Sequence, residues 1–303
     1  MLIILGPTAS GKTHLAVAAA RQRMLAGQPA EIISADSRQV YRGMSIGTGK
    51  DLTEYTEGGP PVPYHLIDVV EAGEAYNVYR YQQDFDRAIQ SILARGATPI
   101  VCGGSGLYLE AALRPTAMLP EPTNETLRAE LELLTNSQLS EKLAQFPPAI
   151  PPPDTTTRKR LMRAVERATY LAAHPHARPR TRPALPPYHT VGLNPPVPVR
   201  RERISQRLHQ RLQHGLVQEV EDLLAQGIPP EKLIFYGLEY RYVTEYLLGR
   251  LPLAEMTRQL ETAIHQFAKR QMTFFRKMER DGLAIAWQPT ATLPALTAPA
   301  APN

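Results

Sequence analysis

Residues 6–13 read Gly-Pro-Thr-Ala-Ser-Gly-Lys-Thr, the pattern of a phosphate-binding loop. The apolar run from Leu2 to Leu5 precedes it and a helical pattern begins at Leu15, which is the strand–loop–helix context that the motif requires. Backbone N–H groups in such a loop turn around an anion, and the helix adds the positive end of its dipole. Lys12 can reach a terminal phosphate oxygen, and Thr13 can offer its hydroxyl to Mg²⁺. The predicted diphosphate-binding residues are Gly6, Pro7, Thr8, Ala9, Ser10, Gly11, Lys12 and Thr13.

Ser34–Gln39 stands at the end of a second predicted strand, Glu31–Ala35. In open α/β sheets, ligands bind at the carboxyl ends of the strands, so Asp36 should point into the crevice that holds the phosphate loop. Three roles remain open for Asp36: holding Mg²⁺ through water, acting as general base towards an attacking amine or hydroxyl, or capping a turn.

Two further turns could contribute to the same crevice. Ile46–Lys50 is glycine-containing and ends in a cation, so Lys50 either contacts phosphate or is an exposed lysine. Gly103–Tyr108 follows the apolar run Pro99–Cys102, and its glycines allow a ligand to approach the backbone closely while Ser105 can donate a hydrogen bond.

The elements that position these residues predict an α/β fold. Apolar runs at 2–5, 31–35, 65–70 and 99–102 alternate with helical patterns, which is typical of a parallel sheet flanked by helices in the manner of P-loop NTPases. Sixteen of the 29 prolines fall within residues 115–198. We therefore expect a catalytic core (1–115 and 199–288), an inserted, mostly helical, Pro-rich subdomain (116–198) and a disordered tail (289–303).

Within that chain, helices are expected at 121–143, 156–172, 200–224, 240–248 and 253–281, with a last short strand at 283–287. The first strand begins at residue 2 and no apolar stretch could span a membrane, so we expect neither a signal peptide nor a membrane partner. Cys102, the one cysteine, is interpreted as a small buried hydrophobe and suits a reducing cytoplasm.

Positive charge is concentrated in one segment. Residues 155–211 hold 13 Arg and Lys against Glu166 and Glu202, a net charge of +11, while the whole chain carries +5. Arg160, Arg163 and Arg167 share one predicted helix face, and a second stripe comprises Arg200, Arg203, Arg207 and Arg211. This distribution favours a polyanionic partner, although any one of these arginines could equally form a surface ion pair.

Taken together, these motifs resemble the tRNA dimethylallyltransferase family, also called tRNA isopentenyltransferases. The resemblance rests on Gly6–Thr13, Ser34–Met44, Ile46–Lys50, Tyr64–Asp68, Gly103–Tyr108, Arg160–Glu166, and Arg203-Ile204 with Arg207 and Gly215-Leu216, and it spans roughly residues 2 to 280 in the family's order. Ser105 stands where the family usually has Thr, the turn reads Thr48-Gly49-Lys50-Asp51, and residues 234–240 differ from the usual Gly-Tyr region.

The resemblance implies transfer of the dimethylallyl group from dimethylallyl diphosphate to the exocyclic amine of the adenosine immediately 3′ of the anticodon in tRNA. It implies Mg²⁺ at Thr13, with Asp36, Thr13, Lys12 and Arg203 as catalytic residues. It further implies that tRNA contacts Asp36, Ser37, Arg38, Gln39, Ser105, Lys159, Arg160 and Arg163. The expected enzyme is a cytoplasmic monomer whose insertion grips the anticodon stem and loop.

Three other functions remain open at this stage. An adenylate isopentenyltransferase would act on a free nucleotide and would not need the basic insertion. A P-loop small-molecule kinase would consume ATP without dimethylallyl diphosphate. A nucleic-acid-binding NTPase would hydrolyse ATP when RNA is added.

Overall fold

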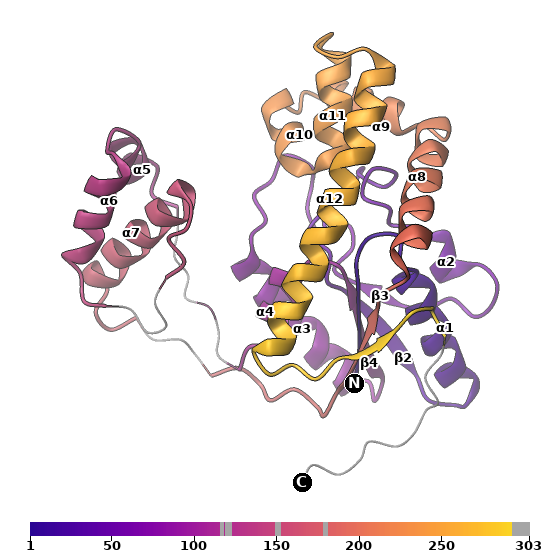
Figure 1. Ribbon diagram of the computed structural model, residues 1–303. Coiled ribbons are helices and arrows are strands. Elements are labelled where there is room, and N and C mark those ends of the chain that lie inside the picture. Colours follow the sequence, from indigo (N-terminus) through magenta and orange to yellow (C-terminus); the bar gives the residue numbers. More distant parts are fainter. Residues whose placement is uncertain (116–117, 119–122, 149–152, 178–180, 293–303) are drawn as a thin grey trace. The chain divides into compact units, whose positions relative to one another are not determined.

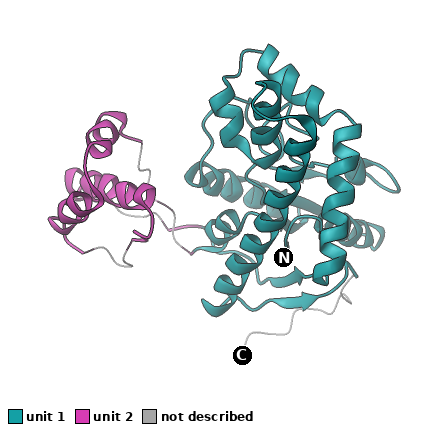
Figure 2. Cartoon of the chain, turned by 45° about the horizontal axis from the view of Figure 1, so that its top comes forward, with its two compact units in different colours: residues 1–114, 183–303 teal, residues 115–182 magenta. Residues whose placement is uncertain are grey.

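The computed structural model describes residues 1–303 except 116–117, 119–122, 149–152, 178–180 and 293–303. The chain forms two compact units, Met1–Arg114 with Pro183–Asn303, and Pro115–Arg182 (Figures 1 and 2). Each unit has its own hydrophobic core and is described by itself.

The first unit is built on a six-stranded parallel sheet with the order β3-β2-β4-β1-β5-β6 (Figure 1). Its strands are β1 (Leu2–Leu5), β2 (Ala30–Ser34), β3 (Tyr64–His65), β4 (Thr98–Gly103), β5 (His189–Leu193) and β6 (Ala286–Gln288). Strand β1, at the centre of the sheet, is apolar throughout because helices cover both of its faces. Side chains alternate between the faces: Leu2 and Ile4 pack on one side, and Ile3 and Leu5 on the other.

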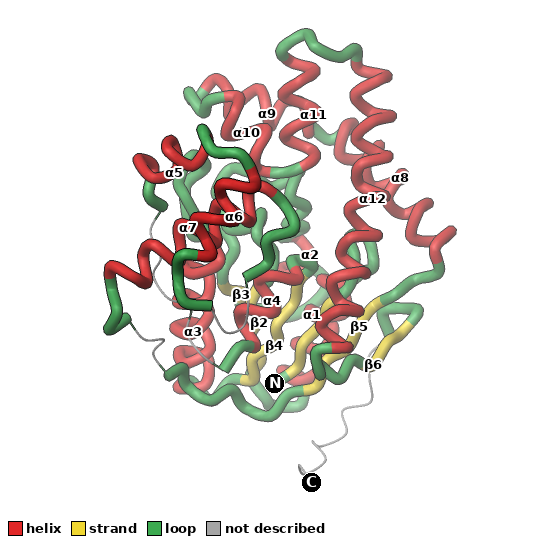
Figure 3. The backbone as a smooth tube through the Cα atoms, turned by 60° about the vertical axis from the view of Figure 1, so that its left-hand side comes forward, coloured by secondary structure: helices red, strands yellow, loops and turns green. Residues whose placement is uncertain are grey.

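The helices of the first unit cover the two faces of the sheet, and a further group of helices forms a separate core. They are α1 (Lys12–Leu25), α2 (Thr53–Thr56), α3 (Val78–Ala94), α4 (Gly106–Leu113), α8 (Val197–Gln213), α9 (Leu216–Ala225), α10 (Pro230–Tyr236), α11 (Leu238–Leu247) and α12 (Leu253–Arg280). Helix α1 covers the Leu2 face, whereas α3, α4 and the last turns of α12 cover the Ile3 face. Helices α8 to α11 and the first part of α12 enclose a separate core with residues 40–44, and α8 lies beside α12 (Figure 3).

The second unit contains α5 (Glu125–Glu132), α6 (Asn136–Ala144) and α7 (Arg158–Ala173). Its small core consists of Leu131, Leu139, Leu161, Met162 and Val165. Polar caps fix the starts of these helices: the Asn124, Thr135 and Thr157 side chains accept hydrogen bonds from the first turns of α5, α6 and α7.

The structure corrects several boundaries. The predicted insertion extended to residue 198, but β5 pairs with β1 in the sheet and the helical unit ends at Arg182. The expected strand at 65–70 is only Tyr64–His65, because Leu66 (φ 62°) and Asp68 (φ 55°) leave the extended conformation. The single helix expected at 200–224 is broken at Gly215, whose φ of 99° cannot continue a right-handed helix.

Helix 121–143 is likewise two helices, α5 and α6, because Thr135 begins a new one with a capping box. Most of the predicted disordered tail, residues 293–303, lies outside the described residues. Within the ranges described, no helix combines the length and hydropathy that a membrane span requires.

Candidate active site

The phosphate-binding loop joins β1 to α1. Gly11 precedes the helix with φ 87°, and Gly6 has φ 157° with so little room that a Cβ would lie 2.6 Å from Leu193 O. Lys12 Nζ donates to Pro7 O at 2.7 Å, so the lysine folds back over the loop. The backbone therefore has the curved form that directs N–H groups at an anion.

Burial sets the chemistry of the charged and polar groups here. Burial lowers the pKa of Lys12 to about 8, and Arg207 acts in the same direction, whereas Asp36 opposes it. The Ser10 hydroxyl is buried without a hydrogen-bond partner among the described residues, so it is available to a bound anion. Cys102 is buried as predicted, and burial raises the pKa of its thiol to about 12, which keeps it protonated and unreactive.

Asp36 lies in the loop that follows β2. Its Oδ1 accepts a hydrogen bond from Arg38 N at 2.9 Å, which closes a tight turn and fixes the carboxylate. The neighbouring Ser37 donates its backbone N–H to Ser105 Oγ at 2.9 Å, and Ser105 N donates to Ala35 O at 3.2 Å. The loops that follow β2 and β4 are therefore linked, as their predicted positions at one sheet edge require.

Gln39 extends this network to the turn at 46–50. Gln39 Nε2 donates to Gly49 O at 3.0 Å, and Ser34 Oγ donates to Gln39 Oε1 at 2.9 Å. The Glu219 carboxylate of α9 accepts the backbone N–H groups of residues 45, 46 and 47 at 2.7–2.9 Å and the Tyr240 hydroxyl at 2.6 Å. Glu219 thereby holds the turn in place.

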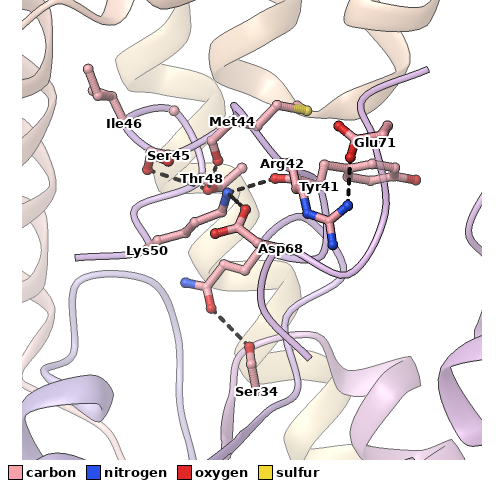
Figure 4. Close-up of polar contacts among 12 residues, drawn as sticks. Ser34, Tyr41, Arg42, Met44, Ser45, Ile46, Thr48, Lys50, Asp68 and Glu71 are labelled. Carbon is pink, nitrogen blue, oxygen red and sulfur yellow. Dashed lines mark hydrogen bonds and ion pairs between the residues drawn. The ribbon is translucent and has the colours of Figure 1, made fainter. Parts of the chain in front are cut away.

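Lys50 is neither exposed nor free to bind phosphate, so both sequence interpretations are wrong. Its side chain is fully buried and donates to Asp68 Oδ1 at 2.5 Å and to Tyr41 O at 2.6 Å (Figure 4). Through these two bonds Lys50 attaches the end of the 46–50 turn to Tyr41 and Asp68.

Gln271 of α12 links two loops of the site, and sequence reasoning did not identify it. Its Oε1 accepts from Thr8 N at 2.8 Å and its Nε2 donates to Gly104 O at 2.9 Å. The signal was present in the sequence: Gln271 shares a helical face with Ile264, Ala268 and Phe275, where a polar side chain is unexpected.

Two cavities meet at the phosphate loop. One, of about 820 Å³, is lined by Lys12, Asp36, Ser37, Arg38, Gln39 and Ser105, and by aromatic side chains of α10 and α12. The other, of about 900 Å³, is lined by residues 9–14, the turn at 45–46, residues 50–54 and Arg203. Lys12, Thr13, Arg207 and Arg211 line both. The structure thus brings together the predicted core-site residues.

The α8 arginines divide between these surfaces. Arg203 is exposed at the second cavity. Arg207 Nη2 pairs with Asp51 Oδ2 at 2.5 Å, and Arg211 Nη1 pairs with Glu239 Oε1 at 3.2 Å. Arg207 and Arg211 therefore face the site, and each also forms an ion pair within the chain.

Lys159, Arg160 and Arg163 lie on α7 in the second unit, whereas the residues that line the two cavities belong to the first unit. Arg160 Nη1 pairs with Asp154 Oδ2 at 2.6 Å on the surface. Arg163 Nη1 pairs with the buried Glu166 carboxylate at 2.5 Å, which also accepts from Arg128 and Asn124 N. Arg163 therefore has a structural role within this unit, whatever else it contacts.

The donor set for the predicted Mg²⁺ consists of one hydroxyl and one carboxylate, from Thr13 and Asp36, on the wall of the first cavity. No group of three or more His, Cys, Asp and Glu side chains suited to a metal occurs in the described part of the chain. This set fits Mg²⁺, which is held by one or two protein ligands together with water and substrate phosphates.

Comparisons with known proteins agree with this geometry. The family model "IPP transferase" matches residues 39–278, and "Isopentenyl transferase" matches residues 1–60. The chain is 49% identical over 289 residues to tRNA dimethylallyltransferase 2 of Porphyromonas gingivalis, covering 95% of this chain and 93% of that one. It is 48% identical over 288 residues to tRNA dimethylallyltransferase 1 of Geotalea uraniireducens, covering 95% and 91%.

Among solved structures, the tRNA isopentenylpyrophosphate transferase of Bacillus halodurans superposes with a TM-score of 0.66 at 30% identity, covering 95% of this chain and 88% of that one. A eukaryotic dimethylallyltransferase acting on tRNA shares the fold, with a TM-score of 0.73 at 20% identity over 96% and 74% of the two chains. With its phosphate loop and Asp36 beside one cavity and nearly its whole length matched, the chain belongs to the IPP transferase family of tRNA dimethylallyltransferases.

Proposed function

We propose that this protein transfers the dimethylallyl group of dimethylallyl diphosphate to the exocyclic amine of the adenosine 3′ of the anticodon in tRNA. The observation that carries the proposal is the single cavity that combines a phosphate-binding loop with Asp36. Family membership supports the same reaction.

The phosphate loop suits the diphosphate of the donor. Loop N–H groups, Lys12 and the unpartnered Ser10 hydroxyl would hold the anion, and Arg203 would add charge from the second cavity. Lys12 is protonated below its pKa of about 8, so at neutral pH it can stabilise the charge that develops on the leaving diphosphate. Mg²⁺, held by Thr13, would neutralise further charge on that group and leave the Asp36 carboxylate free to act on the amine.

The first cavity suits an adenine withdrawn from the RNA. Its lining includes Phe235, which is 63% exposed, and the exposed Phe267, and apolar rings of this kind stack on bases. A loop nucleotide leaves its stack at a cost of a few kcal/mol, less than a paired one. Ser37, Arg38, Gln39 and Ser105 would then hydrogen-bond the polar edge of the base.

Asp36 would act on the amine. The nitrogen forms a bond to the terminal carbon of the prenyl group, the carbon–oxygen bond to diphosphate breaks, and the diphosphate takes that electron pair. The amine loses one proton, which the Asp36 carboxylate accepts. The turn that Asp36 forms with Arg38 N fixes the carboxylate before substrate binds, so the proton acceptor is already in position.

The test compares acceptors at equal concentration: an anticodon stem-loop, the same stem-loop with that adenosine replaced, and free AMP, each with labelled dimethylallyl diphosphate, ATP and Mg²⁺. The proposal expects label in the first alone. Label mainly in AMP would identify a free-nucleotide enzyme, and ATP consumption without any labelled product would identify a kinase or NTPase.

A further inference from the structure

Two guanidinium groups converge on Gly49. A Cβ at this glycine, whose φ is 62°, would lie 1.8 Å from Arg211 Nη2 and 2.2 Å from Arg207 Nη2. Both arginines come from α8, one turn apart, and the absence of a side chain at position 49 is what admits them together. Like charges held this close repel, and an anion that bridges them relieves the repulsion.

One carboxylate balances each arginine, but the two pairs differ. Arg207 is held by Asp51 at 2.5 Å. Arg211 makes only long bonds, 3.2 Å to Glu239 Oε1 and 3.4 Å to Gly47 O, both from Nη1. No other hydrogen bond of Arg211 is present in the described ranges, which leaves Nε and Nη2 for a ligand.

Burial disfavours the charged forms of both Arg211 and Glu239. The side chains are 13% and 18% exposed. Burial lowers the pKa of Arg211 and raises the pKa of Glu239. A single long contact does not compensate two buried charges well, so a second anion at Arg211 would be favourable.

Position identifies the anion. Arg211 lines both cavities together with Lys12 and Thr13 of the phosphate loop. The Arg211 side chain is 13% exposed, too little for broad contact with an RNA backbone, whereas a small diphosphate can enter the cavities. The identification of this anion as the donor diphosphate rests on the proposed function.

We propose that Arg211 is a second guanidinium ligand of the donor diphosphate, placed beside Arg207 by the missing side chain of Gly49 and held by Glu239 until the donor binds. Glu239 is a positioning residue: it holds Arg211 in the free protein, and the diphosphate replaces it as the partner of Arg211 when the donor binds. The phosphate loop then holds the anion from one side and the α8 arginines from the other.

The experiment measures binding of inorganic diphosphate with Mg²⁺ by calorimetry, together with the steady-state constants of transfer, for the wild type and for Arg211→Met, Arg211→Lys and Glu239→Gln. Arg211→Met should raise the Kd for diphosphate and the KM for the donor at least about tenfold, with the KM for RNA unchanged. Arg211→Lys should recover part of that loss. Glu239→Gln should lower the Tm of the free protein yet bind diphosphate at least as tightly as the wild type.

The opposite effects of the two partners separate a ligand from a structural ion pair. Equal Tm losses in Arg211→Met and Glu239→Gln with an unchanged diphosphate Kd would overturn the proposal, as would a rise in the RNA KM alone, which would make Arg211 an RNA ligand. If Arg211→Met fails to fold, the Arg211→Met/Glu239→Gln double variant takes its place. Absence of transfer by the wild type would reject the proposed function, while the diphosphate Kd values would still test Arg211.

Discussion

Thr8 of the phosphate loop donates its backbone N–H to Gln271 Oε1 at 2.8 Å, across 263 residues of sequence. The same side chain donates to Gly104 O after β4. The long helix α12 therefore sets the spacing between the loop that would hold the donor and the turn that carries Ser105. Each loop by itself could shift, but a shared amide fixes them together.

Replacing Gln271 should therefore lower catalysis as well as stability. Gln271→Leu removes both hydrogen bonds, each worth about 1 kcal/mol, so we expect kcat/KM for the donor to fall roughly tenfold. Gln271→Glu is the matched control, because it keeps the acceptor for Thr8 N and should retain more activity. Equal activity of Gln271→Leu and the wild type would show that the two loops need no common anchor.

Donor binding should depend on the protonation of Lys12. Because burial lowers the pKa of Lys12 to about 8, the free enzyme loses this positive charge as the pH rises through 8. We expect kcat/KM for the donor to be constant near pH 7 and to fall above pH 8, with the pH dependence of a single deprotonation at Lys12. Lys12→Arg should lack this fall, since arginine stays charged. A wild-type profile that stays flat to pH 9.5, about 1.5 pH units above that pKa, would contradict the assignment.

The ion pair between the buried Lys50 and the partly exposed Asp68 should be important for the stability of the fold. Asp68→Asn leaves the Lys50 ammonium buried without its counter-charge, and we expect unfolding free energy to fall by about 3 kcal/mol. Lys50→Met/Asp68→Asn should recover part of this, although Tyr41 O still loses its donor. Urea denaturation of the three proteins measures both effects. A loss below about 0.5 kcal/mol in Asp68→Asn would mean that solvent compensates the lysine.

The second unit provides the test of RNA binding. Lys159→Ala/Arg160→Ala removes two exposed charges and should weaken stem-loop binding and flatten its dependence on salt, because fewer counterions are released. Arg163 is left intact, since its loss would uncover the buried Glu166. Arg258→Ala, which removes an exposed arginine of α12, is the control. An unchanged salt slope would make Lys159 and Arg160 ordinary surface residues.

The sequence predicted the core of this site because its motifs are local. Each candidate segment directly follows a buried strand. Because the carboxyl ends of parallel strands meet at one edge of the sheet, Lys12, Asp36 and Ser105 are expected together there. The α/β class followed from the same alternation of strands and helices. Ser105, a departure from the usual Thr, still supplies the oxygen that binds Ser37 N.

Site residues that are far in sequence from the loops they contact could not be predicted from local motifs. Gln271, Glu219 and Glu239 reach the site from helices whose packing no local pattern determines. The sequence predicts Lys50 as a phosphate ligand or an exposed lysine, because no local pattern identifies Asp68 as its partner. Strand β5 was missed because the proline-rich residues around it suggested continued insertion, and only its pairing with β1 reveals it.

Asp36 should affect chemistry far more than binding. Asp36→Asn keeps the shape and the hydrogen bond from Arg38 N, yet its amide cannot accept the proton. We expect kcat to fall between about 10²-fold and 10⁴-fold, with the stem-loop Kd within about twofold of the wild type. A loss of affinity as large as the loss of rate would instead make Asp36 a binding residue. Asp222→Asn, which makes the same change at an exposed carboxylate of α9, is the control.

The most direct measurement is nucleoside analysis by mass spectrometry of an anticodon stem-loop after incubation with the protein, dimethylallyl diphosphate and Mg²⁺. We expect one C5H8 unit on the adenosine 3′ of the anticodon and one diphosphate released for each modified RNA, with both formed at least about 10²-fold more slowly by Asp36→Asn. An unmodified stem-loop, under conditions where the protein is folded and binds the RNA, would contradict the proposed reaction.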